Sequence, residues 1–387
     1  MKNSFPRVSR EIPFARPVIG EDEKQAVLDV LGGHVLTHGP KCTEFEENFA
    51  SYIGTKHAIT MSSCTTALHL SLLALGVSSE DEVIVPAETH VATAHAVEHA
   101  GARPVFIDVE DKSGNINPDL IKRAITSRTK AVIVVHYLGL PCNMEAIRSV
   151  TDSQGVSVIE DCALALGATY GGELPGSLGS TGCFSFYPSK HITTMEGGML
   201  TTNSDNIASI VRKQRAFGYD KGYGQRSVPG IYDVVMLGYN YRMSEVQAAV
   251  GIAQMNRLSD LLQTRRRNAE VLLSRLSEID CLTTFPVDYG LGRSACFCVN
   301  VILPDNDSFS REEVVLELNR VGIGTSVHYP VALPLTSYYR RRYNYQAQAF
   351  PVARWISEKA ISLPVGPHLG KQDMNYIAEE LQSILSN

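Results

Sequence analysis

Three features are missing from this sequence, and each absence excludes a class of protein. No apolar stretch is long enough to span a bilayer, since even AVIVV at 131–135 covers only a small part of that length. The start, residues 1–17, has no apolar run of signal-peptide length. Basic residues are not in excess, because 41 Asp and Glu outnumber 35 Lys and Arg and the net charge is −6. We therefore expect a cytoplasmic protein without a membrane or nucleic-acid partner.

Cysteine pairs with metal-binding spacing are also missing. The eight cysteines are scattered without a CxxC pattern, at 42, 64, 142, 162, 183, 281, 296 and 298. Cys296 and Cys298 lie two apart on an expected strand, so they should point to one face. We interpret them as buried reduced thiols, which fits a reducing compartment, and we predict no metal site.

The pattern of apolar runs predicts an α/β protein. The chain has 387 residues, enough for one large or two medium domains, and it shows no repeats and no low-complexity linker. Short β-rich runs alternate with helical patterns between about 55 and 245, at 81–86, 104–109, 130–138, 156–163, 183–187 and 198–202. The first four runs are almost continuously apolar. They therefore predict strands buried on both faces of a mostly parallel sheet that helices cover.

The second part of the chain has a different texture. A long helical stretch with a break is expected from Ser244 to Ile279, and SEVQ at its start is typical of a capping box. A strand, a helix, a second strand and two further helices are expected after it, at 295–303, 310–320, 322–329, 351–360 and 371–385. We predict a large domain over 1–255, including the N-terminal segment, and a smaller α+β domain over 256–387.

The segment 184–200, FSFYPSKHITTMEGGML, is the most informative part of the chain. Lys190 lies there on a loop between two expected strands, where its amine can face a pocket. Amines held in that way form Schiff bases with carbonyl compounds such as pyridoxal phosphate. One lysine does not establish such chemistry, so the interpretation depends on the residues placed around it.

Further polar residues follow the ends of predicted strands, where open α/β sheets bind ligands. The turn 62–66, SSCTT, could bind a phosphate through helix amides, or Ser63 could simply cap the helix. His90 could lie across a flat ring, or it could be a structural histidine. Asp161 could hold a pyridine nitrogen protonated, or it could cap a helix or form an ion pair. Ser185 could reach a phosphate, and Asn240 could serve a partner subunit or a turn.

Several segments together resemble the DegT/DnrJ/EryC1/StrS family of pyridoxal-phosphate-dependent sugar aminotransferases. The resemblance covers almost the full length and is carried by segments in the same order, at 34–54, 85–109, 159–168, 184–200, 238–249, 327–335 and 350–369. It implies the aspartate-aminotransferase-type fold (fold type I), in which a large domain with a mostly parallel mixed sheet precedes a smaller α+β domain.

The resemblance also implies a role for individual residues. Lys190 would form the Schiff base with the cofactor, Asp161 would pair with its pyridine nitrogen and His90 would stack on its ring. The phosphate would be held by Cys64, Thr65 and Ser185. Asn240 would reach that phosphate from the neighbouring subunit, which implies a homodimer with shared active sites. His328 and Tyr329 fall where relatives line the substrate pocket.

Four positions depart from the family pattern. Leu164 replaces a glutamine that relatives place near the phenolic oxygen of the cofactor, and Cys64 replaces a frequent glycine, which should restrict the turn. Pro334 stands where relatives often have histidine, and His191 where they often have asparagine. A branch of the family that performs dehydration has histidine in place of the lysine, so the retained Lys190 favours transamination.

The expected reaction is therefore amino transfer from L-glutamate, which leaves as 2-oxoglutarate, to a keto-sugar that we expect to be nucleotide-linked. Such a reaction belongs to amino- or deoxysugar biosynthesis for surface polysaccharides or natural products. The alternatives are a pyridoxal-phosphate-dependent deoxysugar dehydratase or lyase, a cyclitol aminotransferase, and a non-catalytic cofactor-binding regulator. The sequence does not identify the sugar, its ring carbon or the nucleotide.

Overall fold

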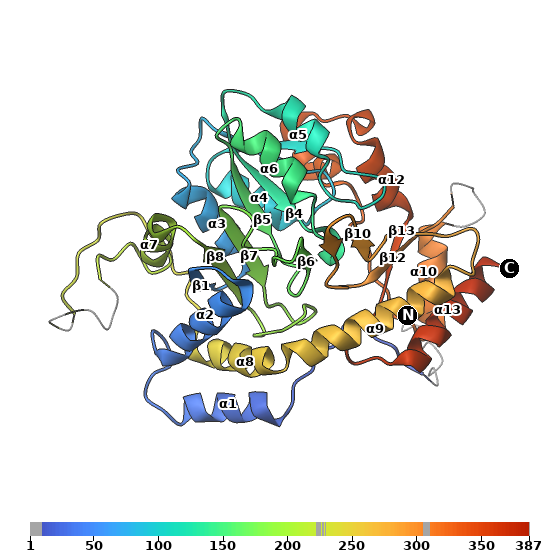
Figure 1. Ribbon diagram of the computed structural model, residues 1–387, viewed down its shortest axis with the longest axis horizontal. Helices are drawn as coiled ribbons and strands as arrows, with labels where there is room; N and C mark the ends of the chain where they lie inside the picture. The colour runs from blue at the N-terminus through green and yellow to red at the C-terminus, as the bar shows by residue number, and fades with distance from the viewer. Residues whose placement is uncertain (1–9, 222–225, 227, 229, 305–309, 387) are drawn as a thin grey trace, which may run out of the picture.

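The computed structural model describes residues 10–221, 226, 228, 230–304 and 310–386. Its centre is a seven-stranded sheet in the order β1-β8-β7-β5-β4-β2-β3 (Figure 1). The strands are β1 His57–Met61, β2 Glu82–Pro86, β3 Arg103–Ile107, β4 Thr129–Val135, β5 Ser157–Asp161, β7 Thr181–Ser185 and β8 Gly198–Thr202. Only the pairs β1–β8 and β7–β8 are antiparallel. The predicted mostly parallel mixed sheet is confirmed.

Both faces of this sheet are covered by helices, which explains the continuous apolar runs. Ile84, Val132 and Val158 pack with α5 Pro118–Ala124 and α6 Met144–Asp152 on one face. Their neighbours along the same strands, such as Val83 and Ile133, pack on the other face. That face is covered by α3 Cys64–Ala74 and α4 Val91–His99, with α7 Asp205–Gln214 against α3. Because successive side chains alternate between faces, burial on both sides requires an apolar residue at every position.

A pair of helices connects the large sheet with the C-terminal part. α8 Glu245–Asn256 begins at the predicted capping box on Ser244 and packs against α1 Glu21–Leu31 and α2 Pro40–Ile53. α9 Leu258–Leu276 continues from it and packs against α13 Lys371–Leu385. The expected break falls at Arg257, whose φ of −116° and ψ of 10° are not helical. The boundary between 255 and 256 stays a prediction.

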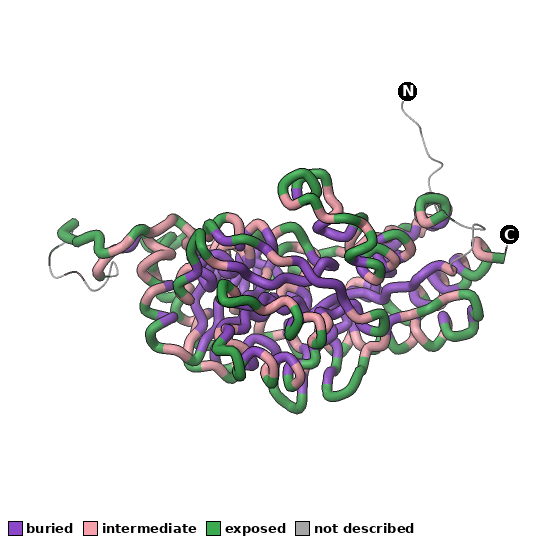
Figure 2. The backbone as a smooth tube through the Cα atoms, turned by 90° about the horizontal axis from the view of Figure 1, so that it is seen from above, coloured by how far each residue is buried: buried purple, intermediate pink, exposed green. Residues whose placement is uncertain are grey.

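The C-terminal part has a second, smaller sheet in the order β13-β12-β9. Its elements are β9 Thr283–Thr284, β12 Val299–Ile302, α10 Arg311–Arg320, η3 Leu333–Leu335, α11 Ser337–Tyr343, η4 Ala347–Ala349, α12 Pro351–Lys359 and β13 Ala360–Leu363. Its apolar core includes Ile12 from the N-terminal segment. The buried backbone runs continuously through both parts in Figure 2.

Three short strands join the two parts, since β6 Thr169–Tyr170 pairs with β11 Gly292–Arg293 and β11 with β10 Asp288–Tyr289.

Among the described residues, no helix combines the length and hydropathy that crossing a membrane requires.

Of two predicted strands of the C-terminal part, one is shorter than expected and the other is wrong. The expected strand 295–303 begins only at Val299, because Cys296 has a φ of 53°, outside the extended region. Cys296 and Cys298 are nevertheless buried free thiols. The segment 322–329 forms no strand and makes only isolated bridges at Ile323 and Ser326. Its later residues line a cavity and present their side chains to it, so they do not take part in the hydrogen bonding of a sheet.

Candidate active site

A cavity of about 450 Å³ lies beyond the carboxyl ends of β4, β5 and β7. It is lined by Ser63, Cys64, Thr65, Leu68, Thr89, His90, Ala92, Val135, Asp161, Ala163, Leu164, Ser185, Tyr187, Lys190, Glu196, Gly197, Val327, His328 and Tyr329. Eight of the nine predicted site residues therefore meet in one cavity, and Asn240 is the exception. The fold brings them together because parallel strands end at the same edge of the sheet.

The N-terminus of α3 presents two amides to this cavity. The hydroxyl of Ser63 caps the helix by accepting the Thr66 amide at 3.2 Å. The amides of Cys64 and Thr65 have no hydrogen-bond partner within the described part of the chain. The Ser63 cap is therefore present, and the next two amides remain available for an anion, so phosphate binding by this turn stays a prediction.

Gly198 allows this turn to sit directly against the sheet. A Cβ atom at Gly198 would lie 2.4 Å from the carbonyl carbon of Ser63 and 2.6 Å from the amide nitrogen of Cys64. Such distances are far below a normal contact. The glycine pair 197–198 is therefore more than a tight turn, because Gly198 makes room for the helix terminus that carries the unpaired amides.

Lys190 extends its amine into the same cavity from a turn between β7 and β8. Its backbone amide donates to the carbonyl of Tyr187 at 2.9 Å, and its carbonyl accepts from Arg265 at 3.2 Å. The Nζ atom lies 5.2 Å from the ring centroid of Phe297. Burial lowers the pKa of the Lys190 amine from its ordinary value, and the nearby Arg265 guanidinium acts in the same direction.

Asp161, the last residue of β5, is held in one orientation by three donors. The Thr93 hydroxyl donates to Oδ2 at 2.9 Å, the Ala163 amide to Oδ1 at 3.1 Å, and the Cys64 thiol lies 3.9 Å from Oδ1. The carboxyl group is 5% exposed and lines the cavity. A buried carboxylate with fixed lone pairs is suited to hold a cationic ring nitrogen.

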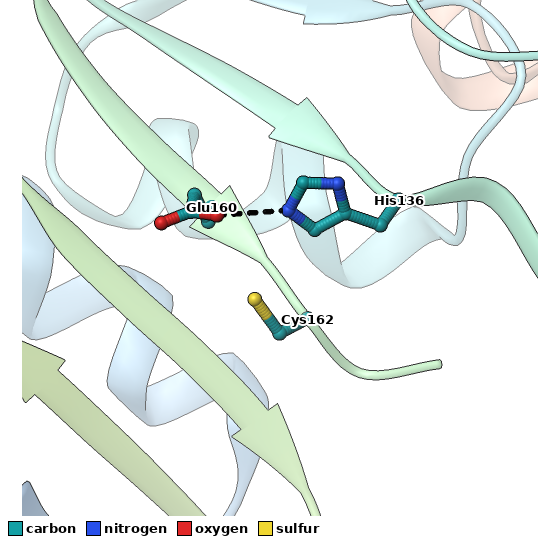
Figure 3. A group of neighbouring side chains, drawn as sticks. All are labelled: His136, Glu160 and Cys162. Carbon is teal, nitrogen blue, oxygen red and sulfur yellow. Dashed lines mark hydrogen bonds and ion pairs between the residues drawn. The ribbon is translucent and has the colours of Figure 1, made fainter. Parts of the chain in front are cut away.

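The neighbouring residue Glu160 points to the opposite face of the strand and fixes β5. Its carboxylate accepts from His136 Nε2 at 3.0 Å (Figure 3), and it also accepts from three amides of the loop 176–179, at 2.7 to 2.9 Å. His136 Nδ1 accepts the amide of Cys142 at 3.0 Å, so both of its nitrogens are used. His136, Glu160 and Cys162 lie close enough to suggest a metal site. Because protein donors already occupy the oxygens of Glu160 and the nitrogens of His136, we assign this group a structural role.

The chain can now be compared with known proteins. The model of the DegT/DnrJ/EryC1/StrS aminotransferase family matches residues 17–382. The chain belongs to this family. It is 38% identical over 97% of its length to an uncharacterised protein of Methanocaldococcus jannaschii, of which 98% is covered. It is 36% identical to the spore coat polysaccharide biosynthesis protein SpsC of Bacillus subtilis, with 97% of each chain covered.

A solved structure agrees with the fold of this family member. The putative sugar aminotransferase Spr1654 from Streptococcus pneumoniae, in its PMP-form, superposes with a TM-score of 0.91 and 28% identity. The match covers 97% of this chain and 99% of the other. The predicted family and the predicted aspartate-aminotransferase-type fold are confirmed.

The remaining predicted residues line the cavity or its surroundings, and their roles stay predictions. His90 is exposed at the start of α4, where its Nδ1 accepts the Ala92 amide at 3.2 Å, and its ring lies 5.9 Å from that of Tyr329. Among the described residues, the Ser185 hydroxyl accepts only the Tyr187 amide, at 3.5 Å. Asn240 is exposed on the segment that leads into α8 and lines no part of this cavity.

Four residues that depart from the family pattern have clear surroundings. Cys64 is the first residue of α3, where helical backbone accommodates any side chain, so no glycine is needed there. Leu164 contributes an apolar wall to the cavity. Pro334 is buried in η3 and does not line the cavity. His191 is buried and donates to the carbonyl of Ala295 at 3.1 Å, and burial lowers its pKa well below the usual range.

The cavity fits pyridoxal phosphate, the cofactor of this family of aminotransferases. Two unpaired amides at a helix N-terminus, which Gly198 accommodates, suit the phosphate. An oriented carboxylate suits the pyridine nitrogen, and a buried amine suits the aldehyde. The phosphate, the pyridine nitrogen and the aldehyde of the cofactor therefore each have a matching group of this chain.

Sequence reasoning missed three residues that support the site. Thr93 orients Asp161, Phe297 packs against the Lys190 amine, and Glu88 accepts the Tyr329 amide at 2.8 Å. Thr93 carries a weak signal, since Thr89 and Thr93 are four residues apart at a helix start and their hydroxyls are 2.8 Å apart. Phe297 is distant in sequence from the residues it contacts, so only the fold identifies it.

Proposed function

We propose that this protein transfers the amino group of L-glutamate to a nucleotide-linked keto-sugar. The chain is a pyridoxal-phosphate-dependent sugar aminotransferase by its family and its structural relatives. Glutamate as donor and a nucleotide on the acceptor are the finer parts of the proposal. The observation that carries it is a single cavity that unites a buried lysine amine, an oriented carboxylate and two unpaired helix amides. The name of SpsC supports a role in making the sugars of a surface polysaccharide.

The residues that would hold the cofactor all line the cavity described above. The Cys64 and Thr65 amides with the hydroxyls of Thr65 and Ser185 would hold the phosphate. Asp161 would hold the pyridine nitrogen, and His90 would cover the ring. When bound, pyridoxal phosphate supplies an aldehyde that exchanges amino groups with substrates and a ring that accepts an electron pair.

Lys190 supplies the mobile proton of the reaction. Since burial lowers its pKa, its Nζ is neutral at a lower pH than an exposed lysine and can take a proton from a substrate carbon. The Phe297 face and the Arg265 bond to its carbonyl keep the side chain directed into the cavity. The same amine, once protonated, can deliver that proton to the carbon of the cofactor's aldehyde group.

Asp161 contributes charge without itself moving. Its three donors fix both oxygens, and Glu160 anchors the same strand end from the opposite face. A preorganised carboxylate stabilises positive charge on a ring nitrogen without reorganisation during the reaction. We infer that this is the group that maintains the electron-accepting capacity of the ring.

We further propose a homodimer with shared active sites. The described residues between 217 and 240 form a projecting arm at the left of Figure 1, and the apolar side chains of Leu237 and Ile231 are 79% and 69% exposed. Exposed apolar groups in such number favour burial against another surface. Asn240, at the end of this arm, would then contribute to the cavity of the second copy.

Mixing two inactive variants tests the shared site. In a mixed dimer of Lys190→Ala and Asn240→Ala chains, one of the two sites receives an intact lysine and an intact asparagine only if Asn240 serves the partner. We expect activity to reappear on mixing under conditions of subunit exchange. Mixtures that stay as inactive as the separate variants would show that both residues serve the same chain.

Spectroscopy of the purified holoprotein tests the function. Adding L-glutamate should convert the visible absorption of the bound cofactor and release 2-oxoglutarate, and Lys190→Ala should do neither. The aminated product is then sought by mass spectrometry with UDP-, GDP- and dTDP-linked 4-keto-6-deoxyhexoses. Consumption of a keto-sugar without net amine transfer would indicate a dehydratase or lyase instead. No spectral change with glutamate would overturn the donor assignment.

A further inference from the structure

Four residues behind the cavity form a closed ring of hydrogen bonds that begins and ends on His328. The imidazole Nδ1 lies 2.8 Å from the hydroxyl of Ser362, and that hydroxyl lies 2.5 Å from Asn300 Oδ1. The amide Nδ2 of Asn300 lies 3.3 Å from the hydroxyl of Tyr137. The Tyr137 hydroxyl in turn contacts the backbone carbonyl of His328. The ring joins β12, β13 and η1 Tyr137–Gly139 to the segment that carries His328.

The direction of every hydrogen bond in this ring follows from its last member. A carbonyl oxygen can only accept, so the single proton of the Tyr137 hydroxyl goes to the His328 carbonyl. Glu88 also contacts this hydroxyl but does not compete for its proton, because burial raises the pKa of Glu88 to about 8 and its carboxyl group is protonated near pH 7. Tyr137 therefore accepts from the amide nitrogen of Asn300, which turns the amide oxygen of Asn300 towards Ser362. Ser362 donates its one proton to that oxygen and must accept from the imidazole. His328 consequently carries a proton on Nδ1.

The other nitrogen of His328 is left for a ligand. No described group hydrogen-bonds Nε2, and the half-buried ring lines the cavity. Phe14 and Phe297 pack on the ring at centroid distances of 5.8 and 5.4 Å. Burial lowers the pKa of the imidazole to about 3, and the nearby Lys190 amine and His90 act in the same direction. The ring is therefore neutral near pH 7, and Nε2 has a free lone pair.

We propose that the hydrogen bonds of Tyr137, Asn300 and Ser362 fix His328 as a hydrogen-bond acceptor that selects the hydroxyl-bearing sugar substrate. This inference deepens the proposed function and rests on it. A neutral Nε2 lone pair accepts a hydrogen bond from a sugar hydroxyl, whereas it offers nothing to a carboxylate, which itself only accepts. His328 thus serves the sugar half of the reaction and not the glutamate half. Tyr137, Asn300 and Ser362 act through His328 and are positioning residues.

The tautomer is measured directly on the wild-type protein. Nitrogen-15 spectra of sedimented holoprotein labelled at histidine distinguish a protonated Nδ1 from a protonated Nε2, and His328→Gln identifies the resonance. We expect a neutral His328 with the proton on Nδ1 between pH 6 and 8. A proton on Nε2, or a charged ring, overturns the inference. This measurement needs no turnover, and it leaves Tyr137, Asn300 and Ser362 unaltered.

The kinetic test uses Ser362→Ala, with Ser326→Ala as the matched control. Ser326 pairs with Ser362 through backbone bonds, and its hydroxyl makes no hydrogen bond to any described group. Ser362→Ala removes the acceptor for Nδ1–H. We expect the KM of the keto-sugar that the wild type converts to rise about tenfold, with the glutamate half-reaction unchanged. Ser362→Thr, which keeps the hydroxyl, should restore the KM.

The outcomes separate this inference from the proposed function. Equal losses in both half-reactions, or an unchanged sugar KM with Ser362→Ala, overturn the role of His328 while leaving the aminotransferase intact. A wild-type protein that converts none of the keto-sugars would contradict the proposed function. The tautomer measurement would still show whether His328 carries its proton on Nδ1. Circular dichroism of Ser362→Ala establishes that its fold is retained.

Discussion

At the scale of single residues, the chemistry depends on an amine that is easier to deprotonate than an exposed lysine. Lys190 is surrounded by an aromatic face and by protein rather than by water, and a guanidinium binds its own carbonyl. Burial in protein rather than in water, and the positive charge of that guanidinium, disfavour the ammonium form and lower the pKa of the side chain. The site thereby obtains a usable base from an ordinary lysine.

The pH at which Lys190 becomes reactive tests this account. Because its folded-state pKa is lowered, its neutral, nucleophilic form appears at a lower pH than that of a free lysine side chain, and the exposed Lys24 serves as the reference in the same measurement. Competitive acetylation of cofactor-free protein at trace reagent, read peptide by peptide in a mass spectrometer, gives a midpoint for each lysine. We expect the Lys190 midpoint clearly below the ~10.4 of free lysine. A midpoint equal to that of Lys24 would contradict the prediction.

Replacement of Asp161 tests the fixed carboxylate. Asp161→Asn keeps the size and the bond from Thr93 but removes the charge opposite a ring nitrogen. We expect kcat to fall by at least about 100-fold, which is typical when one preorganised charged contact is lost. The stability should fall by no more than the cost of one unpaired buried donor, about 1–3 kcal/mol, and a cooperative thermal transition provides the control for the fold. A near-normal kcat would show that this carboxylate has been misassigned.

At the scale of elements, the phosphate site is produced by the meeting of α3 and β8. Neither element forms it alone, since α3 supplies the unpaired amides and β8 supplies the space at Gly198. The antiparallel pairing of β8 with β1, the strand that leads into α3, brings the two together. This explains why a glycine so far along the chain belongs to the same site as Cys64.

Gly198→Ala should weaken both the fold and the binding of the cofactor. The added methyl would collide with the Ser63–Cys64 backbone, and relief of such overpacking costs about 1–3 kcal/mol. We expect a lower Tm and weaker retention of the cofactor during dialysis. Gly32→Ala is the matched control, because a Cβ there meets nothing closer than 3.4 Å on helical backbone. Equal Tm and equal cofactor retention in the two variants would contradict the role of Gly198 in accommodating the α3 turn.

At the scale of the whole molecule, the projecting arm exposes apolar side chains to solvent in an isolated chain. Figures 1 and 2 both show it extending away from the body, and its apolar side chains are exposed. Exposed apolar area of this kind favours association with a second surface. The proposed dimer supplies that surface and also gives Asn240 its role.

Leu237→Asp should weaken self-association. A charge placed in an apolar contact must be desolvated, so we expect the dimer dissociation constant to rise at least tenfold, roughly the cost of losing one well-packed anchor. Analytical ultracentrifugation measures it. Leu316→Asp is the control, since Leu316 is 62% exposed on α10, away from the arm. A dimer that is equally stable in both variants would place the interface elsewhere.

The sequence by itself determined the family, the mostly parallel sheet and the residues at the ends of its strands. The family followed from segments that resemble it in the same order along the chain, and the sheet followed because burial on both faces leaves a continuous apolar run. Asp161 ends β5 and Lys190 follows β7, and parallel strands end at one edge of a sheet. Only the tertiary structure decided that Gly198 accommodates the α3 turn, that 322–329 is no strand, and that Tyr137, Asn300 and Ser362 surround His328. These arrangements depend on contacts between segments far apart in the chain, and local periodicity carries no information about which distant side chains meet.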